Sequence, residues 1–165
     1  MKTPYRTDRT ISTIASTVVE RYLLVEGTPV LRLTNSVVYI AASWQNRFRL
    51  REIRTRLADV GIVVNSQWID FDREYTEGDF GEEADRDYSD IKAADFLILD
   101  TTDRATRGGR EWEAGYATGL GKHIWRVGPV ITPFHVRVQR AFVSGWGDCL
   151  EYLRIGKEHA DARDN

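Results

Sequence analysis

The pattern of apolar and polar positions changes near residue 37. Before that point, apolar residues recur at helical spacing and predict an amphipathic helix over 11–25. After it, short continuous apolar runs predict strands that are buried on both faces. These runs lie at 37–42, 62–64, 96–100 and 123–127.

Amphipathic or capped stretches separate the apolar runs. Leu50, Ile53, Leu57 and Val60 form the apolar stripe of a helix that ends at Gly61. Further helices are predicted at 82–94, 110–120 and 146–153. This alternation predicts an α/β fold with a parallel sheet covered on both faces, whose ligands bind outside the carboxyl ends of the strands.

The predicted organisation is one α/β domain over 37–156, an N-terminal arm over 1–36 and a charged tail over 157–165. The chain has 165 residues, which fits one domain. No apolar run approaches the roughly 20 residues of a membrane span, and the first residues lack the apolar core of a signal peptide. We therefore expect a cytoplasmic protein with no membrane partner.

Charge and cysteine content narrow the function classes. The net charge is −2, which argues against a protein that coats a nucleic-acid polymer but permits binding of one small phosphate. Cys149 is the single cysteine, so an internal disulfide is impossible and a cysteine-built zinc site is not expected. We expect a protein that needs neither a metal nor a cofactor.

The charges are unevenly placed. Ten acidic residues lie between Asp70 and Asp90, against only Arg73 and Arg86. Five arginines crowd residues 47–56. Both runs are typical of solvated faces. Arg47 is the exception, because its place near the start of a predicted helix suits a ligand at that helix N-terminus.

The segment at 106–117 joins the strand at 96–100 to the next helix. Gly108 and Gly109 free the backbone to turn, and a helix N-terminus favours an anion. Arg107 or Arg110 could add a charge-assisted contact to a phosphate. On these grounds alone the phosphate signal is weak, because loops with paired glycines are common.

Two glutamates occupy the first turns of the same helix. An ionised Glu113 at the ligand end of the sheet can act as a nucleophile. Glu111 lies about 200° around the helix from Glu113, so one should face the site and the other solvent. Spacing alone favours the interpretation that both glutamates only match the helix dipole.

Three blocks of the sequence resemble the nucleoside 2-deoxyribosyltransferase family. Residues 109–122, GREWEAGYATGLGK, are similar to its signature of a glycine-containing loop, Glu-x-Gly-x-Ala and a Leu-Gly-Lys turn. Residues 38–43, VYIAAS, resemble its first strand, and residues 87–95, DYSDIKAAD, resemble its aspartate-containing helix. The resemblance covers about residues 37–153.

The resemblance implies a Rossmann-like, flavodoxin-like three-layer fold and cleavage of an N-glycosidic bond. It implies that Glu113 is the nucleophile, that the Tyr39 hydroxyl holds the nucleophilic carboxylate, and that Asp87 contacts the base. A carboxylate beside the sugar also stabilises an oxocarbenium-like transition state, as in retaining glycosidases. Members of the family are typically dimers or larger, so we expect a homo-oligomer.

One position departs from the family pattern. Transferases of the family often carry an aspartate six residues before the nucleophile, and the related nucleotide hydrolases tend to carry a phosphate-binding serine there. This chain has Arg107, which suits a phosphate better than a base. Ser43 also matches a phosphate-contacting serine of those hydrolases. The predicted substrate-binding residues are Ser43, Trp44, Arg47, Arg107, Gly108, Gly109 and Arg110.

The remaining aromatic and special residues are assigned mostly to structure. Trp44 is balanced between a pocket wall and the core. Trp68, Trp112, Trp125 and Trp146 are predicted to be structural, with Trp112 packed beneath its helix. His135 is predicted to be a surface histidine, and Cys149 a small buried residue.

Three functions remain open. The first is an N-glycosidase that hydrolyses a nucleoside or deoxynucleoside 5′-monophosphate. The second is a deoxyribosyltransferase that exchanges one base for another. The third is a nucleotide-binding sensor without activity, because a fold does not fix a function. A more distant fourth is cleavage of NAD, which also breaks an N-glycosidic bond.

Overall fold

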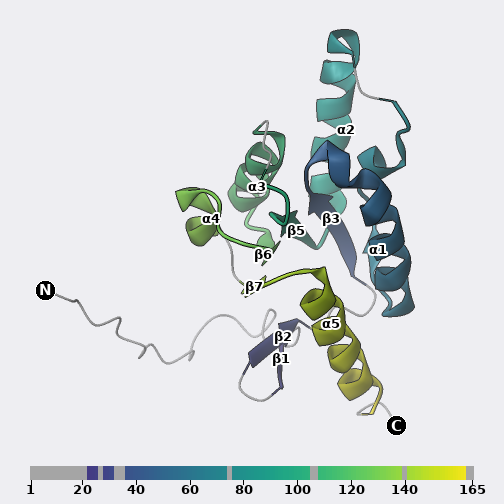
Figure 1. Cartoon of the computed structure of the whole chain (residues 1–165), viewed down its shortest axis with the longest axis vertical. Helices are drawn as coiled ribbons and strands as arrows, with labels where there is room; N and C mark the ends of the chain where they lie inside the picture. The colour runs from purple at the N-terminus through teal and green to yellow at the C-terminus, as the bar shows by residue number, and fades with distance from the viewer. Residues whose placement is uncertain are drawn as a thin grey trace, which may run out of the picture.

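The computed structural model describes residues 22–25, 28–31, 36–73, 76–104, 108–138 and 141–162. Residues 11–21 of the helix predicted over 11–25 lie outside the described ranges. Its last four residues, Tyr22–Val25, form strand β1, which pairs antiparallel with β2 (Thr28–Leu31). The helix prediction is therefore wrong for these residues, where pairing with β2 decides the conformation. Figure 1 shows this hairpin next to the C-terminal helix.

A five-stranded parallel sheet forms the centre of the molecule. Its order is β4 (Val63–Val64), β3 (Val37–Ala41), β5 (Phe96–Asp100), β6 (His123–Val127) and β7 (Ala141–Val143). All neighbouring pairs in this sheet are parallel. This is the flavodoxin-like order, in which the chain reverses direction across the sheet between β3 and β5. The four strands predicted from apolar runs are confirmed, and β7 was not predicted.

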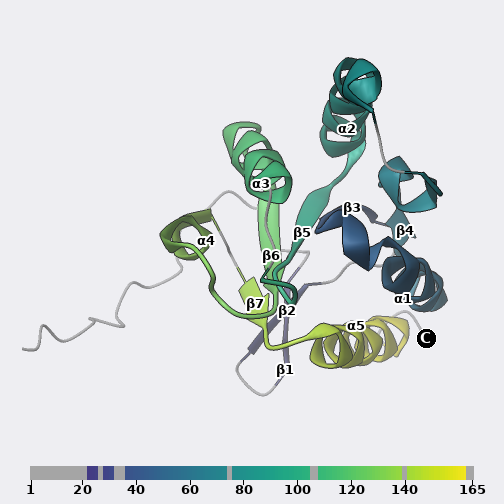
Figure 2. The same cartoon turned by 45° about the horizontal axis from the view of Figure 1, so that its top comes forward.

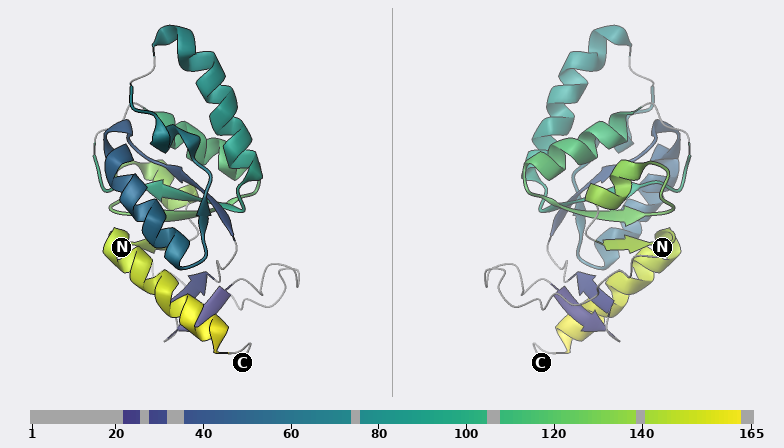
Figure 3. Two further views of the ribbon diagram at one scale, coloured as in Figure 1. Left: turned by 90° about the vertical axis from the view of Figure 1, so that its right-hand side faces the viewer. Right: turned by 90° about the vertical axis from the view of Figure 1, so that its left-hand side faces the viewer.

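Helices cover both faces of the sheet. Figure 2 shows α1 (Arg47–Asp59) and α5 (Trp146–Asp161) on one face, and α2 (Phe80–Ala93) and α3 (Gly109–Gly119) on the other. Figure 3 shows the same two layers from the sides, with the short helix α4 (Pro133–Val138) beside α3. The α/β prediction is thereby confirmed. No helix within these described ranges is long and apolar enough to cross a membrane.

Helix ends and short turns show where the sequence-based boundaries differ. Residues 157–161, predicted to begin a charged tail, continue α5 to Asp161. The predicted loop over 70–81 contains the one-turn helix η4 (Glu77–Asp79) and the first residues of α2. Two further one-turn helices are present: η2 (Trp44–Asn46) precedes α1, and η3 (Gln67–Asp70) follows β4.

The core lies between the sheet and its two helical layers. Both central strands are almost fully buried, in keeping with their continuous apolar runs. Trp68, Trp125, Trp146 and Cys149 are buried as predicted. Trp112 is not, because 69% of its surface is exposed, and its indole nitrogen instead donates a hydrogen bond to the Tyr88 hydroxyl on α2.

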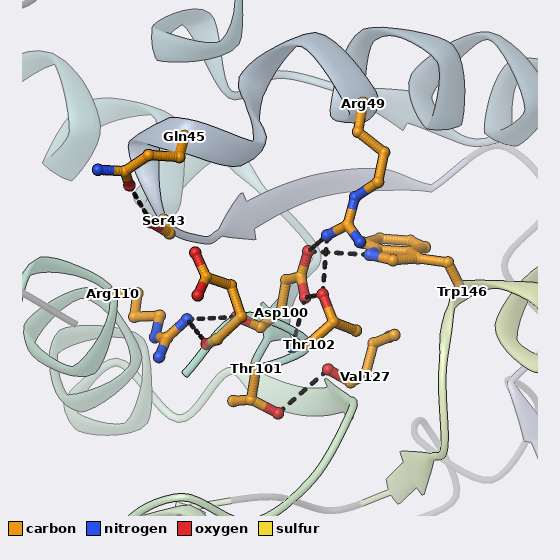
Figure 4. Close-up of polar contacts among 10 residues, drawn as sticks. Ser43, Gln45, Arg49, Asp100, Thr101, Thr102, Arg110, Val127 and Trp146 are labelled. Carbon is orange, nitrogen blue, oxygen red and sulfur yellow. Dashed lines mark hydrogen bonds and ion pairs between the residues drawn. The ribbon is translucent and has the colours of Figure 1, made fainter. Parts of the chain in front are cut away.

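The buried carboxylate of Asp100 fastens the carboxyl edge of the sheet. It ends β5 and accepts hydrogen bonds from Arg49 Nη2 on α1 at 2.8 Å and from Trp146 Nε1 on α5 at 2.9 Å. Its other oxygen accepts from the Thr102 backbone N–H at 2.9 Å and from the Thr102 hydroxyl. Figure 4 shows Asp100 at the centre of these three partners. One side chain therefore positions two helices and the start of the loop to α3.

The ends of β5 and β6 approach one another closely at Gly128. Its φ of 108° lies in the left-handed region, and a Cβ there would stand 2.7 Å from the Thr102 backbone nitrogen. Only glycine fits this position without a shift of the backbone.

Gly128→Ala is expected to destabilise the protein by about 2–3 kcal/mol, because it adds both backbone strain and a clash with the β5–α3 loop. Gly147→Ala in α5 is the matched control, since a Cβ there meets nothing within 4 Å. The control should be neutral or slightly stabilising. Urea unfolding of both variants measures the difference, and equal midpoints would contradict the close approach at Gly128.

Candidate active site

Tyr39 and Glu113 meet on the α2–α3 side of the sheet. Tyr39 lies in the middle of β3 with no exposed surface, and Glu113 lies in the second turn of α3. The Tyr39 hydroxyl donates a hydrogen bond to Glu113 Oε1 at 3.1 Å. The two residues are 74 positions apart, so the parallel sheet and its covering helix bring them together.

Asp87 of α2 is the third member of the group. Its carboxyl lies beside the Tyr39 hydroxyl, close enough for a hydrogen bond that affects the pKa of both groups. A phenol has one proton, which Tyr39 gives to Glu113. The hydroxyl can therefore donate to Asp87 only when it does not donate to Glu113. Between about pH 6 and pH 8 the two carboxyls hold one proton between them.

Desolvation dominates the electrostatics of these three acids. Burial, followed by the negative charge of Asp87, raises the pKa of Glu113 to about 8. Burial also raises the pKa of Asp87 to about 6, although the hydrogen bond with Tyr39 opposes that shift. The pKa of Tyr39 rises well above its usual value, first through burial and then through the charges of the two carboxylates. Because the three acids share one desolvated place, the ionisation of one raises the pKa of the others.

Ser43 and Trp44 lie at the carboxyl end of β3, as predicted. The Ser43 hydroxyl donates a hydrogen bond to Gln45 Oε1, and both residues stand at the sheet edge in Figure 4. Trp44 is half-buried and packs against Trp68, with ring centroids 6.4 Å apart. Trp68 in turn donates to the Ile40 carbonyl, so it acts as a support for Trp44.

Two of the arginines predicted to bind substrate are engaged with the protein's own backbone. Arg47 lies 4.4 Å above the Trp44 ring and donates to the carbonyls of Phe71 and Trp44. Arg110 is buried and donates to the carbonyls of Asp100 and Asp103 and to the Glu111 carboxylate. These contacts give both arginines a role in holding loops. A contact of either with phosphate stays a prediction.

The glycine pair lies at the start of α3. Gly108 precedes the helix with a φ of 88°, and Gly109 is its first residue. The positive φ at Gly108 turns the loop into the helix, whose N-terminus then faces the carboxyl edge of the sheet. Arg107 lies outside the described residues.

Glu111 and His135 differ from expectation. Glu111 does not face solvent freely; it accepts a hydrogen bond from Arg110 and lies 3.5 Å from His135 Nε2. His135 has 1% of its surface exposed, so the prediction of a surface histidine is wrong. The short helix α4, which the sequence did not suggest, carries His135 inward against the start of α3.

The inward side of α2 carries, besides Asp87, three charged residues to which the sequence analysis assigned no role. Glu83, Arg86, Asp87 and Asp90 recur at i, i+3, i+4 and i+7 and are all at least partly buried. Asp90 is structural, since it accepts from the backbone and side chain of Gln67. Their helical spacing within the acidic run was the signal that could have revealed them.

Among the residues that the structure describes, no group of three or more His, Cys, Asp or Glu side chains is arranged to hold a metal ion.

Solved structures with the same architecture place this geometry in context. A 2-deoxyribosyltransferase from Bacillus psychrosaccharolyticus matches with 24% identity over 70% of this chain and 90% of that chain, with a TM-score of 0.55. This chain has the 2-deoxyribosyltransferase fold. A CMP N-glycosidase, BcmB, from Clostridium botulinum shares the fold with 19% identity over 72% of this chain and 98% of that chain, at a TM-score of 0.50.

A conserved protein from Enterococcus faecalis V583 shares the 2-deoxyribosyltransferase fold as well. It is 15% identical over 72% of this chain and 97% of that chain, with a TM-score of 0.54. No protein-family model and no curated protein sequence matches the chain. At these identities the likeness establishes the fold.

Glu113→Gln is expected to stabilise the protein increasingly as pH rises. The folded state holds the Glu113 proton up to about pH 8, whereas the unfolded chain releases it near pH 4.5. The wild type therefore loses stability across this window, and the glutamine variant does not. One unit of pKa shift corresponds to about 1.4 kcal/mol, so we expect a gain of that order or more at pH 9.

Thermal unfolding of both proteins at pH 5, 7 and 9 measures this effect. Glu52→Gln, at an exposed position of α1, controls for a change from glutamate to glutamine. A difference between Glu113→Gln and wild type that stays the same at all three pH values would contradict the buried environment of Glu113.

Proposed function

We propose that the protein is an enzyme that cleaves the N-glycosidic bond of a nucleoside 5′-monophosphate. The products are a free base and a sugar phosphate. The observation that carries the proposal is the hydrogen bond from Tyr39 to Glu113, with Asp87 beside it, at the carboxyl side of a parallel sheet. A carboxylate held in this way can attack an anomeric carbon or stabilise positive charge on the sugar ring.

The proposed reaction needs the single proton of the carboxyl pair on Asp87 at the moment of attack. Glu113 attacks C1′ as the carboxylate that Tyr39 stabilises through its hydrogen bond. The electrons of the C1′–N bond leave with the base, and the protonated Asp87 gives its proton to the base. Water then releases the sugar phosphate from Glu113. The hydrogen bond from Tyr39 favours the ionised form of Glu113 before attack and holds the side chain in position.

A phosphate on the substrate is supported by the sheet edge. The Ser43 hydroxyl and the N-terminus of α3, which begins at Gly108–Gly109, lie where ligands of such sheets bind. The shared fold with a CMP N-glycosidase gives further support to a nucleotide substrate. A homodimer or larger assembly stays a prediction.

Base exchange is the second candidate. The structure with 24% identity is a 2-deoxyribosyltransferase, and the same covalent sugar intermediate can react with a second base in place of water. Formation of a new nucleoside when a second free base is added would show this activity.

Wild-type protein is expected to release base from at least one ribo- or deoxyribonucleoside monophosphate and to act more slowly on the matching nucleoside. Liquid chromatography of a panel of both classes measures this. Glu113→Gln should lower the rate by roughly 10³-fold or more, because the nucleophile is lost. Cleavage of nucleosides but of no monophosphate would overturn the nucleotide preference, and an active Glu113→Gln would overturn the nucleophile.

The pH profile of kcat/KM is expected to be bell-shaped, with limbs near pH 6 and pH 8. Activity needs one proton on the Asp87–Glu113 pair. Both carboxyls are ionised above about pH 8 and both are protonated below about pH 6, so the active form exists between these values. In Asp87→Asn only Glu113 of the pair can titrate. Its profile should be a single limb that rises with pH, displaced below pH 8 because the charge of Asp87 no longer opposes ionisation of Glu113. An unchanged bell in this variant would contradict the shared proton.

A further inference from the structure

Arg86 is a cation on the inward side of α2, next to Asp87. Its side chain is 31% exposed, and that of Glu83, one turn earlier, is 12% exposed. The face of a helix that points towards the protein interior is normally apolar. Charged residues on that face therefore need polar or charged partners. Burial, followed by the charges of Asp90 and Glu83, raises the pKa of Asp87, and the charge of Arg86 lowers it, so the guanidinium lies within electrostatic reach of the proposed base-contacting group.

The guanidinium of Arg86 is held on two sides. Its Nη1 donates to both carboxylate oxygens of Glu83, at 2.8 and 3.0 Å. Its Cζ lies 5.0 Å from the centre of the Phe71 ring. These two contacts fix the plane of the group, which lowers the entropy lost when it binds a ligand.

Two nitrogens of Arg86 remain available. Nε and Nη2 have no hydrogen-bond partner within the described ranges, although the side chain is two-thirds buried. Arg47 and Arg110 differ in part, because they donate to backbone carbonyls, although Arg110 Nη2 is also buried with no hydrogen-bond partner among the described residues. Arg86 therefore offers oriented donors and a positive charge beside Asp87.

We propose that Arg86 contacts the leaving nucleobase and stabilises the negative charge that the base gains as the glycosidic bond breaks. This inference rests on the proposed function and assigns a further catalytic residue to the same site. The C1′–N bond breaks with its electron pair on the base, while a Glu113 oxygen forms the new bond to C1′. Charge spreads from the ring nitrogen to a carbonyl oxygen or ring nitrogen of the base, which accepts hydrogen bonds from Arg86. Asp87 supplies the proton, and Arg86 keeps all of its own.

The contact should matter more in the transition state than in the ground state. A bound base is neutral, whereas a departing base carries developing charge, so the guanidinium binds the departing base more strongly. This predicts a dependence on the leaving group that a purely structural residue would not produce.

The test compares wild type with Arg86→Gln on monophosphates whose bases differ in acidity. For a pyrimidine enzyme the series is the 5-fluoro, unsubstituted and 5-methyl uracil nucleotides; for a purine enzyme it is the 8-bromo and unsubstituted purine nucleotides. Arg86→Gln should lower kcat/KM by roughly 10- to 10²-fold. The loss should be greatest for the least acidic base, so that log kcat/KM falls more steeply with the pKa of the base.

Two further variants complete the design. Arg86→Lys keeps the positive charge and should recover part of the rate. Arg54→Gln, whose guanidinium pairs with Asp70 on the surface of α1, is the matched control and should leave both rate and slope unchanged. Circular dichroism and the thermal midpoint confirm that each variant is folded. A loss in Arg86→Gln that is equal for all bases, or no loss, would overturn the proposal.

Failure of the proposed function is distinguishable from failure of this inference. Binding of free uracil, cytosine, adenine and guanine, measured by calorimetry, does not require cleavage. If wild type cleaves nothing but binds a base, and Arg86→Gln binds it at least 10-fold more weakly, the contact stands without the reaction. If wild type cleaves nucleotides and the slopes are parallel, the reaction stands without the contact. Absence of both cleavage and base binding in wild type would overturn both.

Discussion

The buried carboxylate of Asp100 is the contact on which the carboxyl edge of the sheet depends. It joins the end of β5 to Arg49, Thr102 and Trp146, and so ties α1, α5 and the loop before α3 to a single point. A buried carboxylate is tolerated only when donors surround it, and here four donors from three separate elements do so. Arg110 secures the other end of the same loop through the Asp100 and Asp103 carbonyls. The start of α3, and with it the position of Glu113, is set by these contacts.

Much of the fold could be predicted from the sequence, because its central strands are continuous apolar runs between helices with clear ends. The parts that could not be predicted lack that signal. Strand β7 is three residues long, and its conformation depends on pairing with β6. Helix α5 continues through a highly charged segment, where ion pairs such as Arg154 with Glu151 and Lys157 with Asp161 lie one turn apart. Strand β1 depends in the same way on a partner strand that local spacing does not reveal.

Some residues of the candidate site could be predicted from the sequence, and others could not. The resemblance brought Tyr39, Asp87 and Glu113 to attention, and the parallel sheet places all three together. Charge in the sequence was a poor guide to the arginines, because a sequence shows a guanidinium but not the backbone carbonyls that occupy it. Arg51 and Arg54 tie α1 to residues 69–72, and Arg49 ties it to Asp100, whereas Arg56 is exposed. Arg86 was overlooked for the opposite reason, since it stands almost alone in an acidic run that suggested a solvated face.

The charged groups of the site are arranged in order, from the Glu113 carboxyl on α3, past Tyr39 on β3, to Asp87 and Arg86 on α2. A nucleophilic carboxylate must be ionised at the moment of attack, yet burial favours its neutral form. The hydrogen bond from Tyr39 opposes this effect of burial, and in the proposed reaction the one negative charge of the carboxyl pair lies on Glu113, at the sugar end, when attack begins. The proposed reaction moves that charge from Glu113 towards the base. A fixed cation at the base end, held by Glu83 and Phe71, stabilises the charge after it has moved more than before. The same charge placed beside Glu113 would hold the carboxylate in its ground state and oppose the reaction, so the location of Arg86 on α2 matters as much as its charge.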